Sequence, residues 1–479
     1  MALRTGKEYI DSLDDDRQVW LDGKQVNVLK HEQLRPCVDA FAQIYDLQHD
    51  PKHQDLLVTK SPTTGDPVSL AYLEPRSGDD LRKKRTMIEF LARRSGGTLG
   101  RLTDYKAPLL LGLYDIRDDV ANVNPEWRDN IINYVESYRE KDLCGTHGFA
   151  DPPHDRSVDT NFPFLKVVNE TSKGITLRGA KAVATLAPFA NDFIGLTIPR
   201  PGLKPEEVLM FAVPLNSRNL KIVCRASHTH VKNSEDHPLA AHYDEMDAWM
   251  IFDDVFVPRD RIFFRDRADL LPGMFERVVP VGINHIVIRM AIKAEVLLGT
   301  GVAIAEYMGS TKTPAVQAAL FDMTAYLETL RAFLTAAEAQ ATTTPTGMML
   351  GNRQQLVLGR IYGVDNLPKI LQRLREICGS SLLLAPGEQD RNNPEIGQLI
   401  KTFLMGQDPR TTDRYKMMKL AWDYIADSFG GRQLLFEQYN AQTSPFNKGL
   451  VTAHYNFDSV VEVAKKIARV ASTRAEATP

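Results

Sequence analysis

Three polar side chains in two short segments have the types needed to act together on one oxygen atom. Arg101 and Tyr105 lie in the stretch Gly100–Tyr105, and His147 follows about forty residues later. Arginine is a permanent cation with a planar fork of donors, tyrosine adds a hydroxyl, and histidine can hold or take a proton near neutral pH. Together they could bind an ionisable oxygen of a flat substrate and stabilise its anion. The alternative is a surface ion pair beside a core aromatic side chain.

The elements around these residues predict a helical first domain over residues 1–150. A helix over residues 81–94 is indicated by apolar residues at helical spacing among charges, and it ends just before the first reactive segment. A second amphipathic helix, over residues 127–142, leads directly to the histidine. The sequence Asp151-Pro152-Pro153 cannot continue a helix, so the character of the chain is expected to change there.

The rest of the chain predicts a β domain followed by a helical bundle. Short β runs between residues 164 and 265 indicate a small barrel or sandwich within a domain of residues 151–271, with residues 250–258 as its last strand. A C-terminal domain of residues 272–479 is expected to be an antiparallel bundle with a tail. Its helical candidates span residues 283–307, 315–340, 353–378, 411–429 and 458–470. The expected fold is mainly α with a central β domain, an acyl-CoA dehydrogenase-like layout that holds a flavin between the β domain and the bundle.

Composition excludes several classes of partner. The 479 residues are 43% hydrophobic and 25% charged, as in an ordinary soluble protein, and the net charge is only −3. Neither nucleic acid nor an anionic membrane is therefore expected as the main partner. No apolar run reaches the ~20 residues that a membrane span needs, and the N-terminus has no signal core. The four cysteines form no CxxC pair, which favours a cytoplasmic protein.

Common cofactor motifs are missing or out of place. Gly299-Thr300-Gly301 lies inside a long apolar helix rather than after a strand, so it indicates close helix packing and not a nicotinamide site. His228 and His230, if on a strand, would share one face, with His237 and His242 nearby. Because no cysteine or carboxylate motif accompanies them, no metal is expected.

Many short stretches, in order from residue 4 to at least 440, resemble the 4-hydroxyphenylacetate 3-monooxygenase oxygenase-component family. The stretches are residues 4–9 (RTGKEY), 19–23 (VWLDG), 45–51 (YDLQHDP), 61–65 (SPTTG), 94–97 (RSGG), 100–101 with 104–105, 146–147, 155–157 (DRS), 178–181 (RGAK), 184–188 (ATLAP), 211–216 (FAVPLN), 244–247 (DEMD), 252–258 (FDDVFVP) and 430–433 (GGRQ). Individually most are weak, but the ordered set is specific.

The resemblance implies a flavin-dependent monooxygenase that hydroxylates a phenol ortho to its hydroxyl. Such enzymes use FADH2 made by a separate NAD(P)H:flavin reductase, and O2 reacts with it to give a flavin C4a-hydroperoxide that attacks the ring. Arg101, Tyr105 and His147 match family residues that contact the substrate oxygen. FAD rather than FMN, and a homotetramer, are expected on the same basis. The substrate stays open, including whether it is a free phenol or one tethered to a carrier protein.

The resemblance also implies further binding residues. Flavin contacts are expected at His147, in the following loop, at Thr185 and late in the chain, and substrate contacts just before the expected lid of residues 199–206. The loop departs from the family because Pro153 replaces a glutamine. The flavin set is His147, Pro153, His154, Asp155, Arg156, Thr185, Asn440, Ala441 and Gln442, and the substrate set adds Thr197 and Ile198.

Two other functions remain as alternatives. A 4-hydroxybutyryl-CoA dehydratase-like lyase shares the layout but needs three cysteines and a histidine for an iron–sulfur cluster, whereas residues 95–105 contain no cysteine. A non-catalytic flavin-binding bundle protein would not need the retained arginine, tyrosine and histidine.

Overall fold

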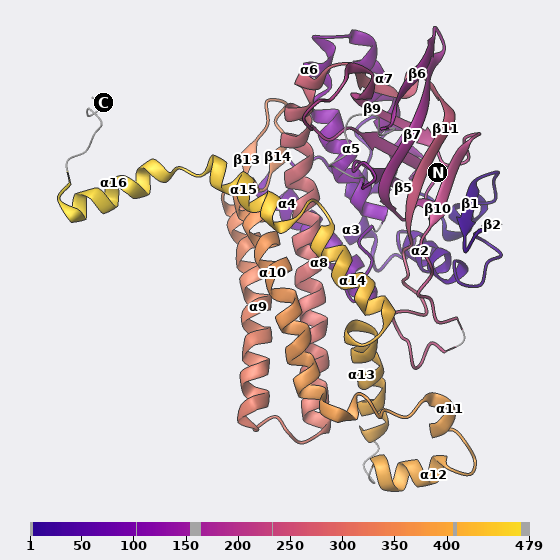
Figure 1. The fold of residues 1–479 in the computed structure, drawn as a ribbon, viewed down its shortest axis with the longest axis vertical. Coiled ribbons are helices and arrows are strands. Elements are labelled where there is room, and N and C mark those ends of the chain that lie inside the picture. Colours follow the sequence, from indigo (N-terminus) through magenta and orange to yellow (C-terminus); the bar gives the residue numbers. More distant parts are fainter. Residues whose placement is uncertain (1–2, 102, 154–163, 232, 406–409, 471–479) are drawn as a thin grey trace.

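The computed structural model describes residues 3–101, 103–153, 164–231, 233–405 and 410–470. Helices and short hairpins of the N-terminal part pack beside two β-sheets, and long helices extend away from them (Figure 1). The N-terminal helices are α1 (Gly6–Asp11), α2 (Arg35–Leu47), α3 (Gln54–Leu57), α4 (Gly78–Arg94), α5 (Lys106–Asp115), α6 (Arg117–Ala121) and α7 (Pro125–Glu140). A small hairpin joins β3 (Val58–Lys60) to β4 (Pro67–Ser69).

The two expected helices that flank the reactive segments are present, and local chemistry explains their starts. The Ser77 side chain accepts the N–H of Asp80 at the start of α4, whose first turn is acidic and whose last turn is basic. Asn124 caps α7, and Pro125 stands at its first position, where no amide donor is needed. The helices therefore begin and end close to where the sequence indicates.

The β part forms two sheets rather than a closed barrel. The six-stranded sheet has the order β2-β1-β10-β11-β7-β6, and the four-stranded sheet has the order β12-β9-β8-β5. Their strands are β1 (Gln18–Leu21), β2 (Lys24–Val26), β5 (Gly145–Gly148), β6 (Lys166–Thr171), β7 (Gly174–Thr185), β8 (Asp192–Leu196), β9 (Leu209–Pro214), β10 (Leu220–Cys224), β11 (Asp247–Pro258) and β12 (Ile262–Arg265). The N-terminal segment thus supplies β1, β2 and β5 to the sheets.

The C-terminal helices pack as a bundle, with α8, α9 and α10 running side by side (Figure 1). The bundle and tail contain α8 (Leu271–Tyr307), α9 (Pro314–Ala339), α10 (Arg353–Cys378), α11 (Glu388–Arg391), α12 (Gly397–Leu399), a π-helical segment (Ile400–Met405), α13 (Arg410–Ile425), α14 (Ser428–Tyr439), α15 (Ser444–His454) and α16 (Phe457–Ala468). A short hairpin, β13 (Thr342–Thr343) with β14 (Met349–Leu350), joins α9 to α10. No helix among the described residues combines the length and apolar character needed to cross a membrane.

Two local expectations were wrong, and the condition attached to a third is not met. The single helix over residues 411–429 is two helices, because the Asp427 side chain accepts the N–H of Phe429 and starts α14. Residues 250–258 are not the last strand, since β12 follows and pairs with β9. His228 and His230 lie in a loop, because β10 ends at Cys224. The domain boundaries at 150 and 271 stay predictions.

Candidate active site

The segment that carries Arg101 reaches the interior through a close approach of two backbones. Gly96 and Gly97 follow α4 with φ of +60° and +73°, a region that glycine adopts at little cost. A Cβ atom on Gly97 would lie 2.8 Å from the carbonyl oxygen of Arg289 in α8. The glycine pair therefore lets the chain turn against α8 and directs Arg101 into the protein.

Glu245, in the loop before β11, holds the backbone of the same segment. Its Oε2 accepts hydrogen bonds from the backbone N–H groups of Gly100 (2.8 Å) and Arg101 (2.9 Å). Its Oε1 accepts from Arg432 Nη1 of α14 at 2.8 Å. This buried carboxylate thus ties the N-terminal segment to the β part and to the bundle.

The guanidinium of Arg101 lies over the ring of Tyr105 and reaches the end of α14. Its Cζ is 4.1 Å from the Tyr105 ring centroid, and its Nη2 donates to Asn440 Oδ1 at 2.8 Å. Arg101 is only 6% exposed and Tyr105 8%. In such a desolvated setting a cation–π contact contributes about 2 kcal/mol. The site therefore contains a buried cation held between an aromatic face and an amide oxygen.

His147 stands on the other side of Tyr105. Strand β5 pairs in parallel with β8, with His147 opposite Ile194. The His147 and Tyr105 ring centroids are 5.7 Å apart, with an angle of 16° between the rings. Burial lowers the pKa of His147 well below its ordinary value, and a positive charge on Lys106 or Arg101 lowers it further. The three residues singled out in the sequence thus form one contact series that ends in a neutral imidazole.

Two further polar residues at this site were not indicated by the sequence. Lys106 Nζ lies 2.5 Å from His147 Nδ1. His285 Nε2 in α8 lies 3.1 Å from Asp104 Oδ2, and its ring stands edge-on to Tyr105 at 5.0 Å and 85°. The available signal was a histidine within the apolar run of α8, a pattern that a satisfied core histidine would also produce.

Backbone strain marks the segment after α14. Ala441 and Gln442 have φ of +58° and +77°, and strain of this kind costs on the order of 1–3 kcal/mol per residue. Arg360 in α10 holds the segment, because its Nη2 donates to the carbonyl oxygens of Asn440 and Gln442, the latter at 2.6 Å. The segment is therefore fixed in a strained form beside Arg101.

Several buried donors around this segment lack acceptors. Asn440 Nδ2 and the Nε and Nη1 atoms of Arg360 have no hydrogen-bond partner among the described residues. Unsatisfied buried polar atoms are uncommon in folded proteins. A ligand rich in acceptor atoms, such as the isoalloxazine carbonyls of a flavin or a phenolate oxygen, would satisfy them.

A buried ion cluster fixes α14 on α8. Glu437 Oε2 accepts from Arg289 Nη2 at 2.6 Å, and its Oε1 lies 2.5 Å from Lys293 Nζ. All three side chains are at most 3% exposed. Burial alone would raise the pKa of Glu437, but the two cations outweigh it and lower that pKa to about 2. A charged cluster thus holds the helix that delivers Asn440.

The other residues expected to bind flavin or substrate differ in their burial and in their hydrogen-bond partners. The hydroxyl of Thr185 donates to Asp247 Oδ1 at 2.7 Å, and that of Thr197 donates to the carbonyl oxygen of Glu207 at 2.6 Å. Ile198 is half-buried, while Pro153, Ala441 and Gln442 are exposed. His154, Asp155 and Arg156 lie outside the described residues. The binding roles of all these residues stay predictions.

The loop after His147 is anchored to β7 and to the expected lid of residues 199–206. Asp151 lies 2.8 Å from Lys181 Nζ and 3.3 Å from Arg200 Nη1. Arg200 Nη2 also donates to Glu207 at 2.6 Å. One half-buried carboxylate and one arginine therefore connect the two loops that border the site.

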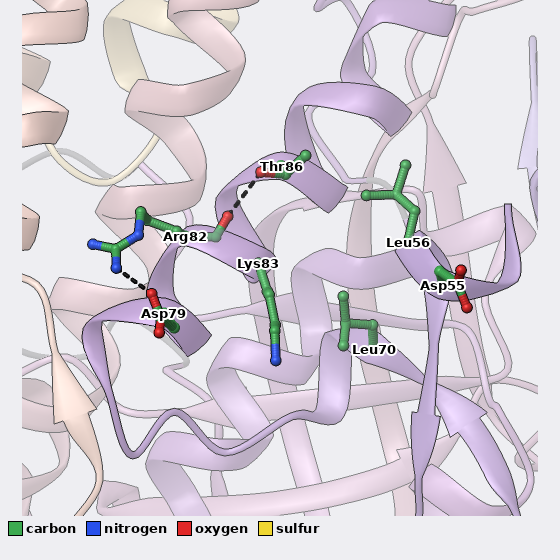
Figure 2. Close-up of a pocket in the computed structure, with 7 residues that line it drawn as sticks. All are labelled: Asp55, Leu56, Leu70, Asp79, Arg82, Lys83 and Thr86. Carbon is green, nitrogen blue, oxygen red and sulfur yellow. Dashed lines mark hydrogen bonds and ion pairs between the residues drawn. The ribbon is translucent and has the colours of Figure 1, made fainter.

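Two surface pockets open elsewhere. One, of about 370 Å³, lies over α3 and α4, where Arg82 pairs with Asp79 and where Asp55 and Lys83 are among the lining residues (Figure 2). The other, of about 610 Å³, lies between α10, α14 and the start of α15, and Glu437 and Thr443 are among its lining residues. Neither is lined by Arg101, Tyr105 or His147. The second borders the strained segment after α14 from the bundle side.

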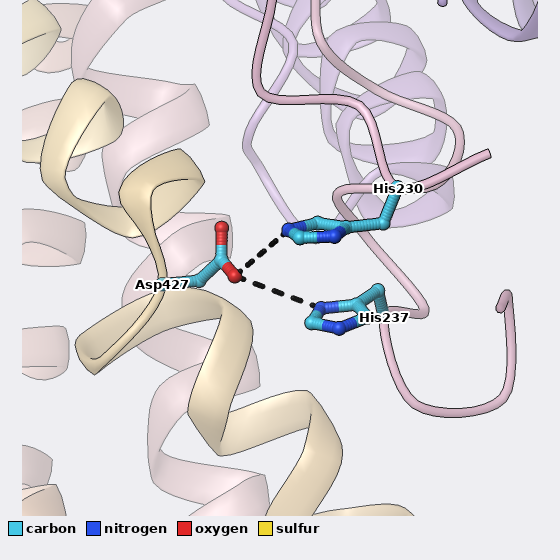
Figure 3. Close-up of side chains that lie close together, drawn as sticks. All are labelled: His230, His237 and Asp427. Carbon is cyan, nitrogen blue, oxygen red and sulfur yellow. Dashed lines mark hydrogen bonds and ion pairs between the residues drawn. The ribbon is translucent and has the colours of Figure 1, made fainter. Parts of the chain in front are cut away.

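His230, His237 and Asp427 form the group of side chains, among the described residues, that could hold a metal ion (Figure 3). The imidazole rings stack at 3.7 Å between centroids and 9° between planes. Because a ring nitrogen binds a metal in the plane of its ring, two parallel planes this far apart share no common ligand point. Asp427 and the site residue Asn440 cap opposite ends of α14, about 20 Å apart. The geometry instead indicates a structural role: the Asp427 carboxylate contacts both histidines and holds the loop between β10 and β11. We call this contact the carboxylate clamp.

This clamp should make stability depend on pH. A hydrogen bond from His237 Nδ1 to Asp423 Oδ1, 3.0 Å long, raises the pKa of His237, and Asp427 adds to the effect. A raised pKa stabilises the fold below about pH 6.5, and that contribution is lost as the pH rises through the folded-state pKa. His237→Gln should therefore lower the free energy of unfolding by about 1 kcal/mol at pH 5.5 and by less at pH 8.5, as measured by urea unfolding. His242→Gln, at an exposed position, should change neither value; equal losses for His237→Gln at both pH values would contradict the prediction.

Comparisons with known proteins cover nearly the whole chain. Family models described as the N-terminal and C-terminal parts of 4-hydroxyphenylacetate 3-hydroxylase match residues 5–264 and 281–469. The FADH(2)-dependent monooxygenase TftD of Burkholderia cepacia is 32% identical, over 91% of this chain and 87% of that protein. The oxygenase component of 4-hydroxyphenylacetate 3-monooxygenase from Thermus thermophilus is 31% identical, over 91% of each chain.

Solved structures give the same result. A crystal structure of a 4-hydroxyphenylacetate 3-monooxygenase oxygenase component, complexed with FAD and 4-hydroxyphenylacetate, superposes with a TM-score of 0.91 at 29% identity, covering 97% of this chain and 98% of that one. An archaeal 4-hydroxybutyryl-CoA dehydratase from N. maritimus reaches a TM-score of 0.89 at 22% identity, covering 99% of this chain and 96% of that one. The second likeness shows the fold alone.

The fold and the relatives together place the chain in the class of aromatic monooxygenases with acyl-CoA dehydrogenase-like architecture. The chain belongs to the 4-hydroxyphenylacetate 3-hydroxylase family, whose two models together span nearly all of it. The resemblance found in the sequence is thereby confirmed, and so is the expected fold class.

Proposed function

We propose that this chain is the oxygenase component of a two-component system that hydroxylates a phenol ortho to its hydroxyl, using FAD reduced by a separate NAD(P)H:flavin reductase and O2. The observation that carries the proposal is the contact series of the buried Arg101 and Tyr105 with the half-buried His147, closed by Asn440. It provides a cation, a hydroxyl and a neutral imidazole in one enclosed place. Such a place suits the oxygen atom of an aromatic ring.

The chain's own residues bind and activate the ring. Arg101 pairs with the substrate oxygen and stabilises its anion, Tyr105 donates to it, and His147 accepts its proton. Each charge-assisted contact of this kind contributes on the order of 1–3 kcal/mol in a dry site. A phenolate oxygen raises the electron density at the ortho carbon, which makes that carbon the nucleophile. Bound reduced FAD supplies the activated oxygen that the ring carbon attacks.

Residues that would hold the flavin are proposed from the unsatisfied donors. Asn440 Nδ2 and the free nitrogen atoms of Arg360 could donate to flavin acceptors, and Ala441, Gln442 and Thr185 are proposed as further flavin contacts. His147 and the loop residues Pro153, His154, Asp155 and Arg156 complete the proposed set. The four cysteines are free thiols, which supports a reducing, cytoplasmic location.

The test supplies reduced FAD and O2 to the purified chain together with a panel of phenols. The panel includes 4-hydroxyphenylacetate, 2,4,6-trichlorophenol and 4-nitrophenol, which appear in the names of relatives, and a carrier-bound phenol, because one relative acts on a peptidyl-carrier-protein substrate. Catechols or their further products should appear by mass spectrometry in amounts that follow the reduced flavin consumed. Formation of hydrogen peroxide alone across the whole panel would overturn the proposal.

A homotetramer is proposed as the working assembly. Helix α16 projects away from the body (Figure 1), and its Val460, Val461, Val463 and Ile467 are 43–79% exposed. An isolated helix of twelve residues is marginal in water, so its apolar face is expected to pack on another copy of the chain. Deleting residues 457–479 should lower the mass measured by light scattering; an unchanged tetramer, or a full-length monomer, would contradict this.

A further inference from the structure

Lys106 is a buried lysine whose surroundings differ from those of an ordinary structural lysine. Its side chain, at the first position of α5, is 1% exposed. Its Nζ lies 2.5 Å from His147 Nδ1 and 4.6 Å from the centroid of the Tyr105 ring. Among the described residues it forms no ion pair with a carboxylate. A permanent ammonium here would therefore be buried without a counter-ion, which is costly.

The charged and titratable groups around Lys106 explain why it need not be charged. Arg101 and Tyr105 face it from its own segment, His147 from β5, Cys144 from just before β5, Tyr138 from α7 and Glu245 from the loop before β11. The Glu245 carboxylate is already satisfied by two backbone N–H groups and Arg432. Burial lowers the pKa of Lys106 well below its ordinary value, and the Arg101 charge lowers it further.

Lys84 shows what a structural buried lysine looks like in the same protein. Its Nζ donates to the carbonyl oxygens of Ala71 (2.7 Å) and Leu73 (2.9 Å). A carbonyl oxygen can only accept a hydrogen bond, so Lys84 can act only as a donor. The partner of Lys106 is an imidazole nitrogen, which can donate or accept. Only Lys106, of the two, can exchange a proton with its partner.

We propose that Lys106 is a positioning residue that acts through His147 and stores the proton given up by the phenol, so that the substrate is bound as its phenolate without loss of a proton to solvent. The inference rests on the function proposed above. It concerns where the phenol proton goes, and it adds a residue that the sequence motif of Arg101, Tyr105 and His147 does not contain.

The proton transfer balances within three groups. At rest, His147 carries its proton on Nδ1 and donates it to the neutral amine of Lys106, which leaves Nε2 as an acceptor. When a phenol binds, its O–H proton passes to Nε2 while the Nδ1 proton passes to Nζ. The products are a phenolate, a neutral His147 protonated on Nε2, and an ammonium on Lys106. The two cations, Lys106 and Arg101, then face one new anion, which supplies the missing counter-charge.

The test follows the ionisation of 4-nitrophenol bound to the full-length protein carrying reduced FAD under anaerobic conditions. At a pH about one unit below the solution pKa of this phenol, two quantities are recorded: the phenolate absorbance, and the protons released to a weakly buffered indicator. The wild-type protein should show a phenolate band with no proton released per phenol bound. Release of one proton, or absence of the band, would overturn the proposal.

Variants of Lys106 distinguish a role in storing the proton from a role in packing alone. Lys106→Met should raise the pKa of the bound phenol by about one unit or more, a tenfold change in ionisation, and shift the pH profile of hydroxylation upward. Lys106→Arg keeps a permanent charge, so its phenolate band should persist but with one proton released per phenol; this variant serves if the methionine variant does not fold. Lys84→Met should behave as wild type in both readings. If the Lys106 variants match the wild type in both the phenolate band and the proton release, the inference is refuted.

The outcomes also separate this inference from the proposed function. A wild-type protein that ionises the bound phenol and yields only hydrogen peroxide would refute the hydroxylase and leave the proton store intact. Efficient hydroxylation, together with a Lys106→Arg variant that releases no more protons than the wild type, would refute the proton store and leave the hydroxylase intact.

Discussion

Replacing Arg101 with methionine should lower kcat/KM for phenol hydroxylation by about 10²–10³-fold, the loss typical of removing one donor from a developing oxyanion. The change removes the buried cation that lies on Tyr105 and leaves Asn440 Oδ1 without its donor. The phenol would then bind as its neutral form and react slowly. The measurement is hydroxylated product per reduced flavin consumed, which should fall sharply while hydrogen peroxide rises.

A matched variant separates charge from shape at the same position. Arg101→Lys keeps the positive charge but loses the planar fork that can reach Asn440 and a substrate oxygen together. It should be intermediate, with rates closer to wild type at higher pH, where the phenol ionises unaided. If Arg101→Met keeps its rate within about twofold of wild type, Arg101 does not bind the reacting oxygen.

The second large effect is expected on stability, at the ion cluster that holds α14. Glu437→Gln leaves the buried cations Arg289 and Lys293 without their carboxylate. Breaking a buried ion pair from one side costs about 3–5 kcal/mol, because the remaining charge is buried and uncompensated. The free energy of unfolding, measured by urea denaturation at pH 7, should fall by that amount, and FAD affinity should fall with the displacement of Asn440.

The effect should also depend on pH in a defined direction. The pKa of Glu437 is lowered from 4.5 to about 2, so its stabilising contribution is fully present above pH 4.5 and is lost as the pH falls towards 2. The difference between wild type and Glu437→Gln should thus be constant between pH 5 and 7 and shrink below 4.5. Glu126→Gln, which breaks an exposed pair with Arg259, should have little effect; a similar loss in both variants would show that burial is not the cause.

The sequence by itself determined the local elements and indicated the first three residues of the proposed site. Helical spacing predicted α4 and α7 closely, and β-rich runs with turns predicted the strand-rich region between residues 164 and 265. The ordered motifs indicated the family, which the matching models confirmed. These features could be found because each depends on residues close together in the chain, whose propensities and spacing act locally.

The errors arose where packing or strand pairing, and not local sequence, decides the structure. The break between α13 and α14 was missed because Asp427 has a side chain that can either sit on a helix surface or cap a new helix, and packing selects the second. The loop that carries His230 was taken as a possible strand because alternation alone cannot show whether a neighbouring strand is present to pair with it.

Only the tertiary structure decided how the site is closed. Arg101 meets Glu245 and Asn440 across 144 and 339 residues of sequence, and Lys106 meets His147 across 41. No periodicity links such positions, since their contact is set by the turn at Gly97 against α8, by the parallel pairing of β5 with β8, and by the buried charges that fix α14. Those long-range contacts turn an arginine, a tyrosine and a histidine into one buried site, and they alone reveal the lysine beside it.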